Sequence, residues 1–129
     1  MLTDDFRRRT CSQLSYSDTT TTRLPISCNI APTQDILPVR FNPETKQRSL
    51  DALRWGLIPY WAKDPKIAYK TINARVESVD TAPSYRQAFK KRRCLIPSDG
   101  FYEWKKVLGG KIPYSIGMKD NSPFAFAGL

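Results

Sequence analysis

Aromatic and cationic side chains alternate in one segment of the sequence, residues 54–70. Its members are Trp55, Tyr60, Trp61 and Tyr69 among Arg54, Lys63, Lys66 and Lys70. Aromatic rings stack unpaired bases, at about 1–3 kcal/mol for each base, while cations follow a phosphate backbone. The pattern therefore indicates a surface for single-stranded nucleic acid. The alternative is that Trp55 and Trp61 are core residues, because large aromatic side chains are buried on average.

An amide and a guanidinium follow in residues 72–77, which we expect to be extended. Alternate side chains of an extended segment share a face, so Asn73 and Arg75 lie on one surface while Ile72 and Ala74 lie on the other. One surface thus receives a hydrogen-bonding amide and a permanent positive charge together.

A single carboxylate interrupts the aromatic residues of a predicted strand, residues 100–104. Glu103 lies between Tyr102 and Trp104, and burial among such neighbours raises the pKa of a carboxyl group toward that of a general acid or base. The alternative is a structural carboxylate that forms an ion pair with Arg75 or with a lysine. The sequence leaves both readings of Glu103 open.

Positive charge is in excess along the chain. Its 129 residues include 21 Lys and Arg, 12 Asp and Glu and no His, which gives a formal net charge of +9. Such a charge favours a polyanionic partner such as nucleic acid. Residues 86–111 hold eight of the cations and two carboxylates, and this cluster is either part of a binding surface or an ordinary solvated face.

The three cysteines, Cys11, Cys28 and Cys94, form no CxxC pair, and no histidine completes a zinc site. We therefore expect neither a metal nor a cofactor. An odd number of cysteines argues against a secreted disulfide scaffold, and Cys28 and Cys94 are expected to be small buried residues. No apolar run approaches the ~18 residues of a membrane span, so we expect an intracellular, soluble protein, cytoplasmic or, in a eukaryote, nuclear.

The elements that must position these side chains are short. We expect residues 1–27, rich in Ser, Thr and Arg, to be an atypical and partly disordered region, and residues 28–129 to form a domain. Strands are predicted at 36–41, 49–57, 94–97, 100–104, 113–118 and 124–129, with hairpin turns at 42–45 and 109–110 and a turn at 98–100. One helix is predicted at 84–89, before the basic run 90–93. The fold class is α+β, mainly antiparallel sheet with one or two short helices.

Four motifs occur in an order that makes the assignment specific. They are NIAPTQ at 29–34 with Pro38 and Val39, RWGLIPYW at 54–61, INARVE at 72–77 and DGFYEW at 99–104. In this order they resemble the SOS-response-associated peptidase (SRAP) family, whose members process abasic sites in DNA. The resemblance runs from about residue 28 to the end, where Pro113, Tyr114 and residues 126–129 fit the strands that follow in family members.

The resemblance implies a compact β-rich fold with a positively charged groove for single-stranded DNA that carries abasic sites, and a peptidase and lyase activity linked to DNA damage. In the family, an N-terminal cysteine forms a thiazolidine cross-link with the ring-opened sugar. By matching position, Asn73 orients that cysteine and Glu103 is the acid/base, so both are candidate catalytic residues. Arg75 contacts phosphate, and Tyr60 and Trp61 stack near the lesion; with Trp55 these form the candidate DNA-binding set. We expect a monomer.

Two features depart from the family pattern. Members begin with Met-Cys-Gly-Arg, whereas Leu2 follows Met1 here and Cys11 and Cys28 are internal; members also use a later histidine, and this sequence has none. We therefore expect the N-terminal part of an SRAP domain that lacks the nucleophile and is impaired in catalysis. The alternatives are a non-catalytic remnant that binds single-stranded DNA and a chain that does not fold stably.

Overall fold

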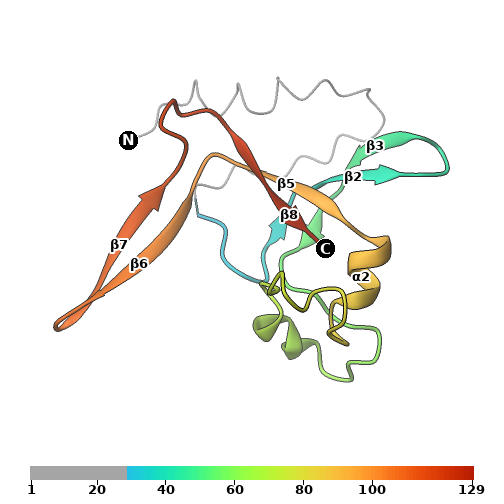
Figure 1. Cartoon of the computed structure of the whole chain (residues 1–129), viewed down its shortest axis with the longest axis horizontal. Coiled ribbons are helices and arrows are strands. Elements are labelled where there is room, and N and C mark those ends of the chain that lie inside the picture. Colours follow the sequence, from blue (N-terminus) through green and yellow to red (C-terminus); the bar gives the residue numbers. More distant parts are fainter. Residues whose placement is uncertain (1–28) are drawn as a thin grey trace.

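The computed structural model describes residues 29–129. Its elements are β1 (Asp35–Ile36), β2 (Val39–Asn42), β3 (Gln47–Leu50), β4 (Leu53–Arg54), the 3-10 helix η1 (Pro65–Lys70), α2 (Arg86–Lys91), β5 (Cys94–Ser98), β6 (Phe101–Val107), β7 (Gly110–Ile116) and β8 (Phe124–Gly128). Short strands dominate, and the described residues contain two short helices (Figure 1). The predicted α+β class is confirmed. The expectation for residues 1–27 lies outside the described residues.

All strand pairs in the described part are antiparallel and form three sheets. The largest has the order β3-β2-β5-β8, and two smaller ones pair β1 with β4 and β6 with β7. Strand β5 lies between β2, from the start of the described chain, and β8, from its end. The central sheet therefore depends on contacts between distant parts of the sequence.

The first hairpin follows the predicted turn. The Asn42 side-chain oxygen accepts hydrogen bonds from the backbone N–H groups of Glu44 at 2.9 Å and Thr45 at 3.3 Å, which is the local bonding that makes asparagine common in turns. The predicted flanking strands are each split in two. Strand 36–41 breaks at Pro38, which is buried and has no N–H for a ladder. The strand predicted at 49–57 is also two strands. The first, β3, begins earlier and pairs with β2; the second, β4, pairs with β1.

The second hairpin, β6–β7, extends away from the larger sheet as a two-stranded ribbon (Figure 1). Val107 pairs with Gly110, which leaves Leu108 and Gly109 as the loop, and Gly109 has a φ of 87°. Glycine suits this position because other residues rarely adopt positive φ. The turn at 98–100 does not form a hairpin: β5 pairs with β2 and β8, so this turn carries the chain from the larger sheet to the ribbon.

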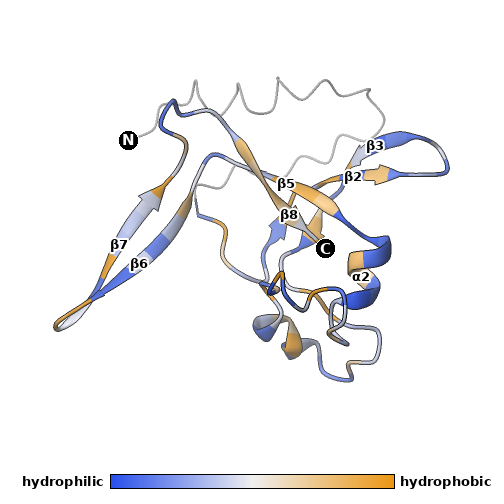
Figure 2. Cartoon of the chain, in the orientation of Figure 1, coloured by the Kyte–Doolittle hydropathy of each residue, from blue (hydrophilic) through white to orange (hydrophobic). Residues whose placement is uncertain are grey.

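Apolar packing in the described residues is modest. The fully buried hydrophobic side chains include Ala68, Ala88 and Pro38, and hydrophobic residues gather where β5 and β8 run together (Figure 2). Phe101, Phe124 and Phe126 meet edge to face, with ring centroids 5.1–6.3 Å apart. Such pairs add about 0.5–1.5 kcal/mol each beyond area burial, so this cluster holds the base of the ribbon against β8.

The helices flank the candidate site. Helix α2 begins two residues later than predicted and carries Lys90 and Lys91 in its last turn, as expected from the helix dipole. Helix η1 was not predicted; Pro65 begins it, and the Asp64 carboxylate accepts a hydrogen bond from the Lys66 N–H at 2.9 Å. Neither described helix is long and apolar enough to cross a membrane.

Candidate nucleic-acid interface

A buried threonine joins the two segments that carry the candidate site. The Leu57 N–H donates to the Thr71 carbonyl at 3.3 Å, and the Thr71 hydroxyl lies 2.5 Å from the Leu57 carbonyl, to which it donates. Thr71 is 8% exposed. Residues 55–61 are thereby fixed beside the start of residues 72–75.

Glycine is required where residues 55–61 approach η1. Gly56 has a φ of 123°, and a Cβ at this position would lie 2.8 Å from the Ala68 carbonyl oxygen. Both the backbone conformation and the close approach exclude a larger residue. The glycine within the RWGLIPYW motif therefore allows residues 55–61 to pack on the helix.

Trp55 fixes the backbone just before Asn73. Its indole N–H donates to the Ile72 carbonyl at 3.0 Å, while its backbone N–H donates to Gln34 at 2.9 Å and its carbonyl accepts from Thr33 at 2.8 Å. The side chain is half-buried. Trp55 is thus anchored at both its backbone and its ring, and its role in stacking a base stays a prediction.

Tyr85 fixes the next carbonyl. Its hydroxyl donates a hydrogen bond of 2.9 Å to the Asn73 carbonyl, and burial raises the pKa of this hydroxyl above its usual 10.0, which keeps it protonated as a donor. Two successive carbonyls, of Ile72 and Asn73, are therefore each bound by an aromatic side chain. Sequence reasoning missed Tyr85, and the only available signal was its place near the start of the predicted helix 84–89.

Arg75 is exposed two residues farther on. The segment 72–77, which was expected to be extended, forms no strand: the backbone is irregular and enters a turn in which the Ser78 N–H donates to the Arg75 carbonyl at 3.2 Å. Among residues 29–129 the ion pair is between Arg40 and Asp51, at 3.3 Å, so Arg75 is in no ion pair with a described residue. Its guanidinium is available to an external anion.

Tyr60 and Trp61 present their rings to solvent. Tyr60 is 85% exposed and Trp61 47% exposed, while the preceding Pro59 is buried. The Trp61 indole N–H points at the Pro83 carbonyl, 3.5 Å away. The alternative that Trp61 is a core residue is wrong, because residues 59–61 turn over the surface as a loop. Exposed rings are what a stacking surface needs.

Glu103 does not have the burial that its sequence neighbours suggested. It is exposed on β6, opposite Tyr114 on β7, and Tyr102 and Trp104 are themselves 47% and 57% exposed. The physical reason is that a two-stranded ribbon has solvent on both faces. Within residues 29–129 it has neither a side-chain hydrogen bond nor an ion pair. The predicted burial is wrong, the alternative ion pair is not formed, and the catalytic role stays a prediction.

The site residues thus fall into two groups. Hydrogen bonds link Trp55 and Tyr85 to residues 72–73, and Trp61 to residue 83, so the 55–61 loop, the Asn73–Arg75 segment and the start of α2 lie together. Glu103 lies on the ribbon, and within residues 29–129 its side chain makes no hydrogen bond or ion pair with them. Residue 2, Cys11 and Cys28 lie outside the described residues, so the expectation about the nucleophile also stays a prediction.

Cysteine and metal chemistry are limited in the described part. Cys94 on β5 is half-buried, and burial raises the pKa of its thiol while the charge of Arg40 opposes this. No group of three or more His, Cys, Asp and Glu in residues 29–129 is arranged to hold a metal ion. The expectation that Cys94 is a small buried residue is met only in part: it is half-buried, and it packs beside Gly128, where an added Cβ would lie 2.6 Å from the sulfur.

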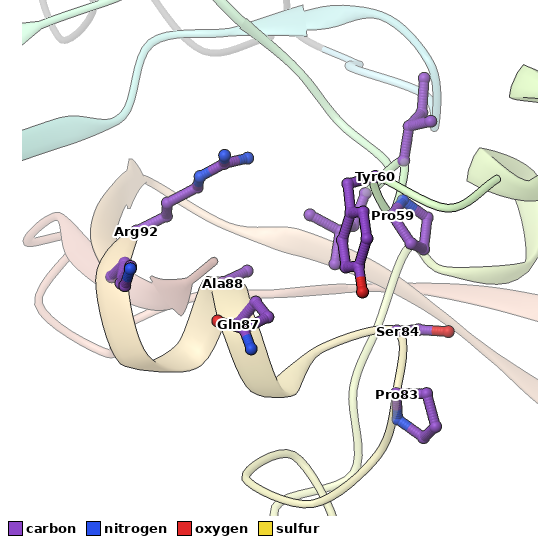
Figure 3. Close-up of a pocket in the computed structure, with 10 residues that line it drawn as sticks. Pro59, Tyr60, Pro83, Ser84, Gln87, Ala88 and Arg92 are labelled. Atoms are coloured by element: carbon purple, nitrogen blue, oxygen red, sulfur yellow. The ribbon is translucent and has the colours of Figure 1, made fainter.

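A cavity of about 320 Å³ opens beside the exposed tyrosine, between the 57–60 segment and α2 (Figure 3). The residues that line it are Leu57, Ile58, Pro59, Tyr60, Pro83, Ser84, Gln87, Ala88, Lys91 and Arg92. Sequence reasoning placed Tyr60 and the basic run 90–93 in separate patterns. The structure brings them to one cavity.

Comparison with known proteins identifies the family. The profile described as SOS response associated peptidase (SRAP) matches residues 2–129. The chain belongs to the SRAP family. A similar SRAP relative, abasic site processing protein YoqW of Bacillus subtilis (strain 168), is 52% identical over 104 residues, which cover 80% of this chain and 46% of YoqW. The abasic site processing protein HMCES of Xenopus tropicalis is 42% identical over 77 residues, 57% of this chain and 23% of HMCES.

Two solved structures have a similar fold. A crystal structure of a protein from Bordetella bronchiseptica matches with a TM-score of 0.67 and 27% identity, covering 81% of this chain and 52% of that chain. A second, from Bacteroides thetaiotaomicron, matches with a TM-score of 0.57 and 33% identity, over 70% of this chain and 39% of that chain. The chain spans about half the length of YoqW and of the Bordetella bronchiseptica protein.

Proposed function

We propose that this SRAP chain binds single-stranded DNA at abasic sites and takes part in the processing of those sites. The observation that carries the proposal is the pair of hydrogen bonds from Trp55 and Tyr85 to the carbonyls of Ile72 and Asn73. These bonds fix the backbone at the start of the Asn73–Arg75 segment to the 55–61 loop and to α2. Asn73 and Arg75 are exposed, and so are Tyr60 and Trp61. The names of YoqW and HMCES support the same function.

Each side chain of this surface has a distinct task in the proposal. Tyr60 and Trp61 stack the bases that flank the lesion, where an intact strand would continue its own base stack. Arg75 binds a phosphate through its planar, permanently charged guanidinium. Asn73 offers an amide, both donor and acceptor, to the attacking group of the reaction. A DNA substrate also places the protein in the compartment that holds DNA.

The reacting groups follow the family pattern. In intact members, the free α-amine of a cysteine condenses with the aldehyde of the opened sugar and releases water to give an imine. The thiol of the same residue then adds to the imine carbon, its proton passes to the nitrogen, and the thiazolidine ring closes. Glu103 is the proposed proton donor and acceptor for imine formation and reversal. The peptidase and lyase activities of the family are part of the same proposal.

A second function is favoured by one observation. Glu103 is exposed on the ribbon and has no bond to the Asn73 segment. A chain with a binding surface and no assembled catalytic group is a single-stranded-DNA-binding protein that does not process the lesion. The two proposals share the same surface and differ only in chemistry.

The binding proposal is tested with three oligonucleotides of equal length: a single strand with a stable abasic analogue, the same strand undamaged, and a duplex. Fluorescence anisotropy with the 129-residue chain is expected to give tighter binding to both single strands than to the duplex, because a duplex cannot offer unpaired bases to Tyr60 and Trp61. Equal affinity for duplex and single strand contradicts the proposal. Incubation with the natural, aldehyde-bearing abasic strand then separates an enzyme from a binder.

A further inference from the structure

The cavity beside α2 has an aromatic wall, an apolar floor and a cationic end. Pro59 and Ala88 are buried at its floor, and Tyr60, 85% exposed, forms one wall. In Figure 3 the Tyr60 ring stands opposite α2, and Arg92 extends from the end of the helix. Its volume of about 320 Å³ is at the small end of the range of about 300–1,000 Å³ for small-molecule sites.

The residues that line the cavity suit a ligand that is planar and negatively charged. None of the ten lining residues is acidic, and two of them, Lys91 and Arg92, are cations. Ser84 and Gln87 add hydroxyl and amide groups that both donate and accept hydrogen bonds. A nucleotide has these properties. Its flat base can contact the Tyr60 ring and the apolar lining, its base edges can form hydrogen bonds, and its phosphate can bind the cations.

The two cations have a role beyond stabilising the helix. Positive charge in the last turn of α2 offsets its dipole, and Lys90 and Lys91 both do so. Lys90 does not line the cavity, whereas Lys91 does. Arg92 lies past the helix, where its backbone N–H donates to the Ala88 carbonyl at 2.7 Å. Among residues 29–129 the Arg92 side chain makes no hydrogen bond or ion pair, so its guanidinium is available to a phosphate.

The cavity is next to the proposed DNA surface. Ser84, which lines it, precedes Tyr85, whose hydroxyl binds the Asn73 carbonyl, and Tyr60 is followed by Trp61, which points at Pro83. We propose that this cavity is a nucleotide subsite for a single strand: one base next to the lesion lies against Tyr60, and its phosphate lies at Lys91 and Arg92. The inference rests on the proposed function, because it assumes that the strand follows the Asn73–Arg75 surface.

The test compares two double variants with the same loss of charge at the same end of α2. Lys91→Gln with Arg92→Gln removes the cations that line the cavity, and Lys90→Gln with Arg93→Gln removes two neighbours that do not. The probe is an undamaged single-stranded oligonucleotide, with affinity measured by anisotropy from low to moderate salt. The slope of log affinity against log salt is expected to flatten by about 0.7 for the first variant, the value for one phosphate on a single strand. The second variant is expected to keep the parental slope.

The base is tested through the ring. Tyr60→Ala is expected to weaken binding by about 5- to 150-fold, the range for one stacked base, whereas Tyr60→Phe keeps a ring and is expected to recover most of the affinity that Tyr60→Ala loses. Phe41→Ala removes an aromatic ring that is 56% exposed on β2, outside the cavity, and is the control. Circular dichroism checks that each variant keeps the parental fold.

The outcomes separate the two proposals. Equal slopes for the two double variants, with a parent that binds, overturn the subsite and leave the proposed function intact. A Tyr60→Phe variant that binds as weakly as Tyr60→Ala also overturns the subsite, since the ring was its basis. A folded parent that binds no single strand at low salt overturns both.

Discussion

The Tyr85 hydroxyl donates a hydrogen bond of 2.9 Å to the carbonyl of Asn73, twelve residues away in the sequence. Tyr85 is the N-cap residue of α2, so this bond connects the helix directly to the segment that carries the proposed amide and guanidinium. A change in α2 therefore changes the position of Asn73.

Replacing Tyr85 by Phe tests this connection. The ring and its packing remain, and only the hydroxyl is lost, so the unfolding free energy is expected to fall by about 0.5–1.5 kcal/mol, the usual net value of one hydrogen bond. Affinity for a single strand is expected to fall as well, because the Asn73–Arg75 backbone loses its anchor. Urea unfolding and anisotropy measure the two effects. Tyr114→Phe, at an exposed ring on β7, is the control, and equal effects from both variants contradict the account.

Thr71 is the buried link between the two segments of the site. Thr71→Val keeps the shape but leaves the Leu57 carbonyl without its hydroxyl donor, at an expected cost of about 1–3 kcal/mol for an unsatisfied buried group. Thr81→Val is the matched control, since the Thr81 hydroxyl donates to the Ser78 carbonyl at an exposed turn. Similar unfolding curves for the two variants refute the role given to Thr71.

Stability is expected to depend on pH in the alkaline range. Burial raises the pKa of the Cys94 thiol above 9.0 and that of the Tyr85 hydroxyl above 10.0. Above these values the unfolded chain releases protons that the folded chain retains, so the free energy of unfolding falls as pH rises from about 9. Melting temperatures between pH 7 and 10.5 measure the effect. Cys94→Ala is expected to remove the part that begins near pH 9, and a decline unchanged in that variant rules out the thiol as its cause.

Expressed from Met1 to Leu129, the polypeptide is expected to form no heat-stable cross-link with an abasic single strand. A thiazolidine needs a thiol and a free α-amine on one residue; Leu2 has no thiol, and the nitrogens of Cys11, Cys28 and Cys94 are in peptide bonds. A denaturing gel without reductant is the measurement. The positive control joins the family's Met-Cys-Gly-Arg start and a histidine-bearing C-terminal half from a relative. A shifted band from the unchanged polypeptide shows that another group supplies the nucleophile.

Local signals predicted much of the fold. The turn at Asn42, the glycines at the tip of β6–β7 and the basic end of α2 were readable because each depends on its own neighbours. What was missed depends on distant partners. The break at Pro38 follows from the separate pairings of β1 with β4 and of β2 with β3 and β5, which no local pattern contains.

In the candidate site, too, features that depend on sequence neighbours were predicted and features that depend on distant partners were missed. The exposed rings of Tyr60 and Trp61 and the exposed Arg75 agree with the predicted surface. The burial of Glu103 was inferred from aromatic neighbours, but side chains on a ribbon are buried only if another layer covers it, and sequence neighbours do not supply that layer. Tyr85 was missed because its partner, the Asn73 carbonyl, belongs to the backbone and leaves no sequence signal.

The central claim, that the face around Arg75 binds single-stranded DNA, is tested most directly by the salt dependence of affinity for an abasic single strand. Arg75→Gln removes the proposed phosphate contact, and Arg48→Gln removes an exposed cation on the distant β2–β3 hairpin. The parental log–log slope is expected to flatten by about 0.7 in Arg75→Gln and to stay unchanged in Arg48→Gln. Equal slopes for all three proteins, or no binding by the folded parent at low salt, would contradict the claim.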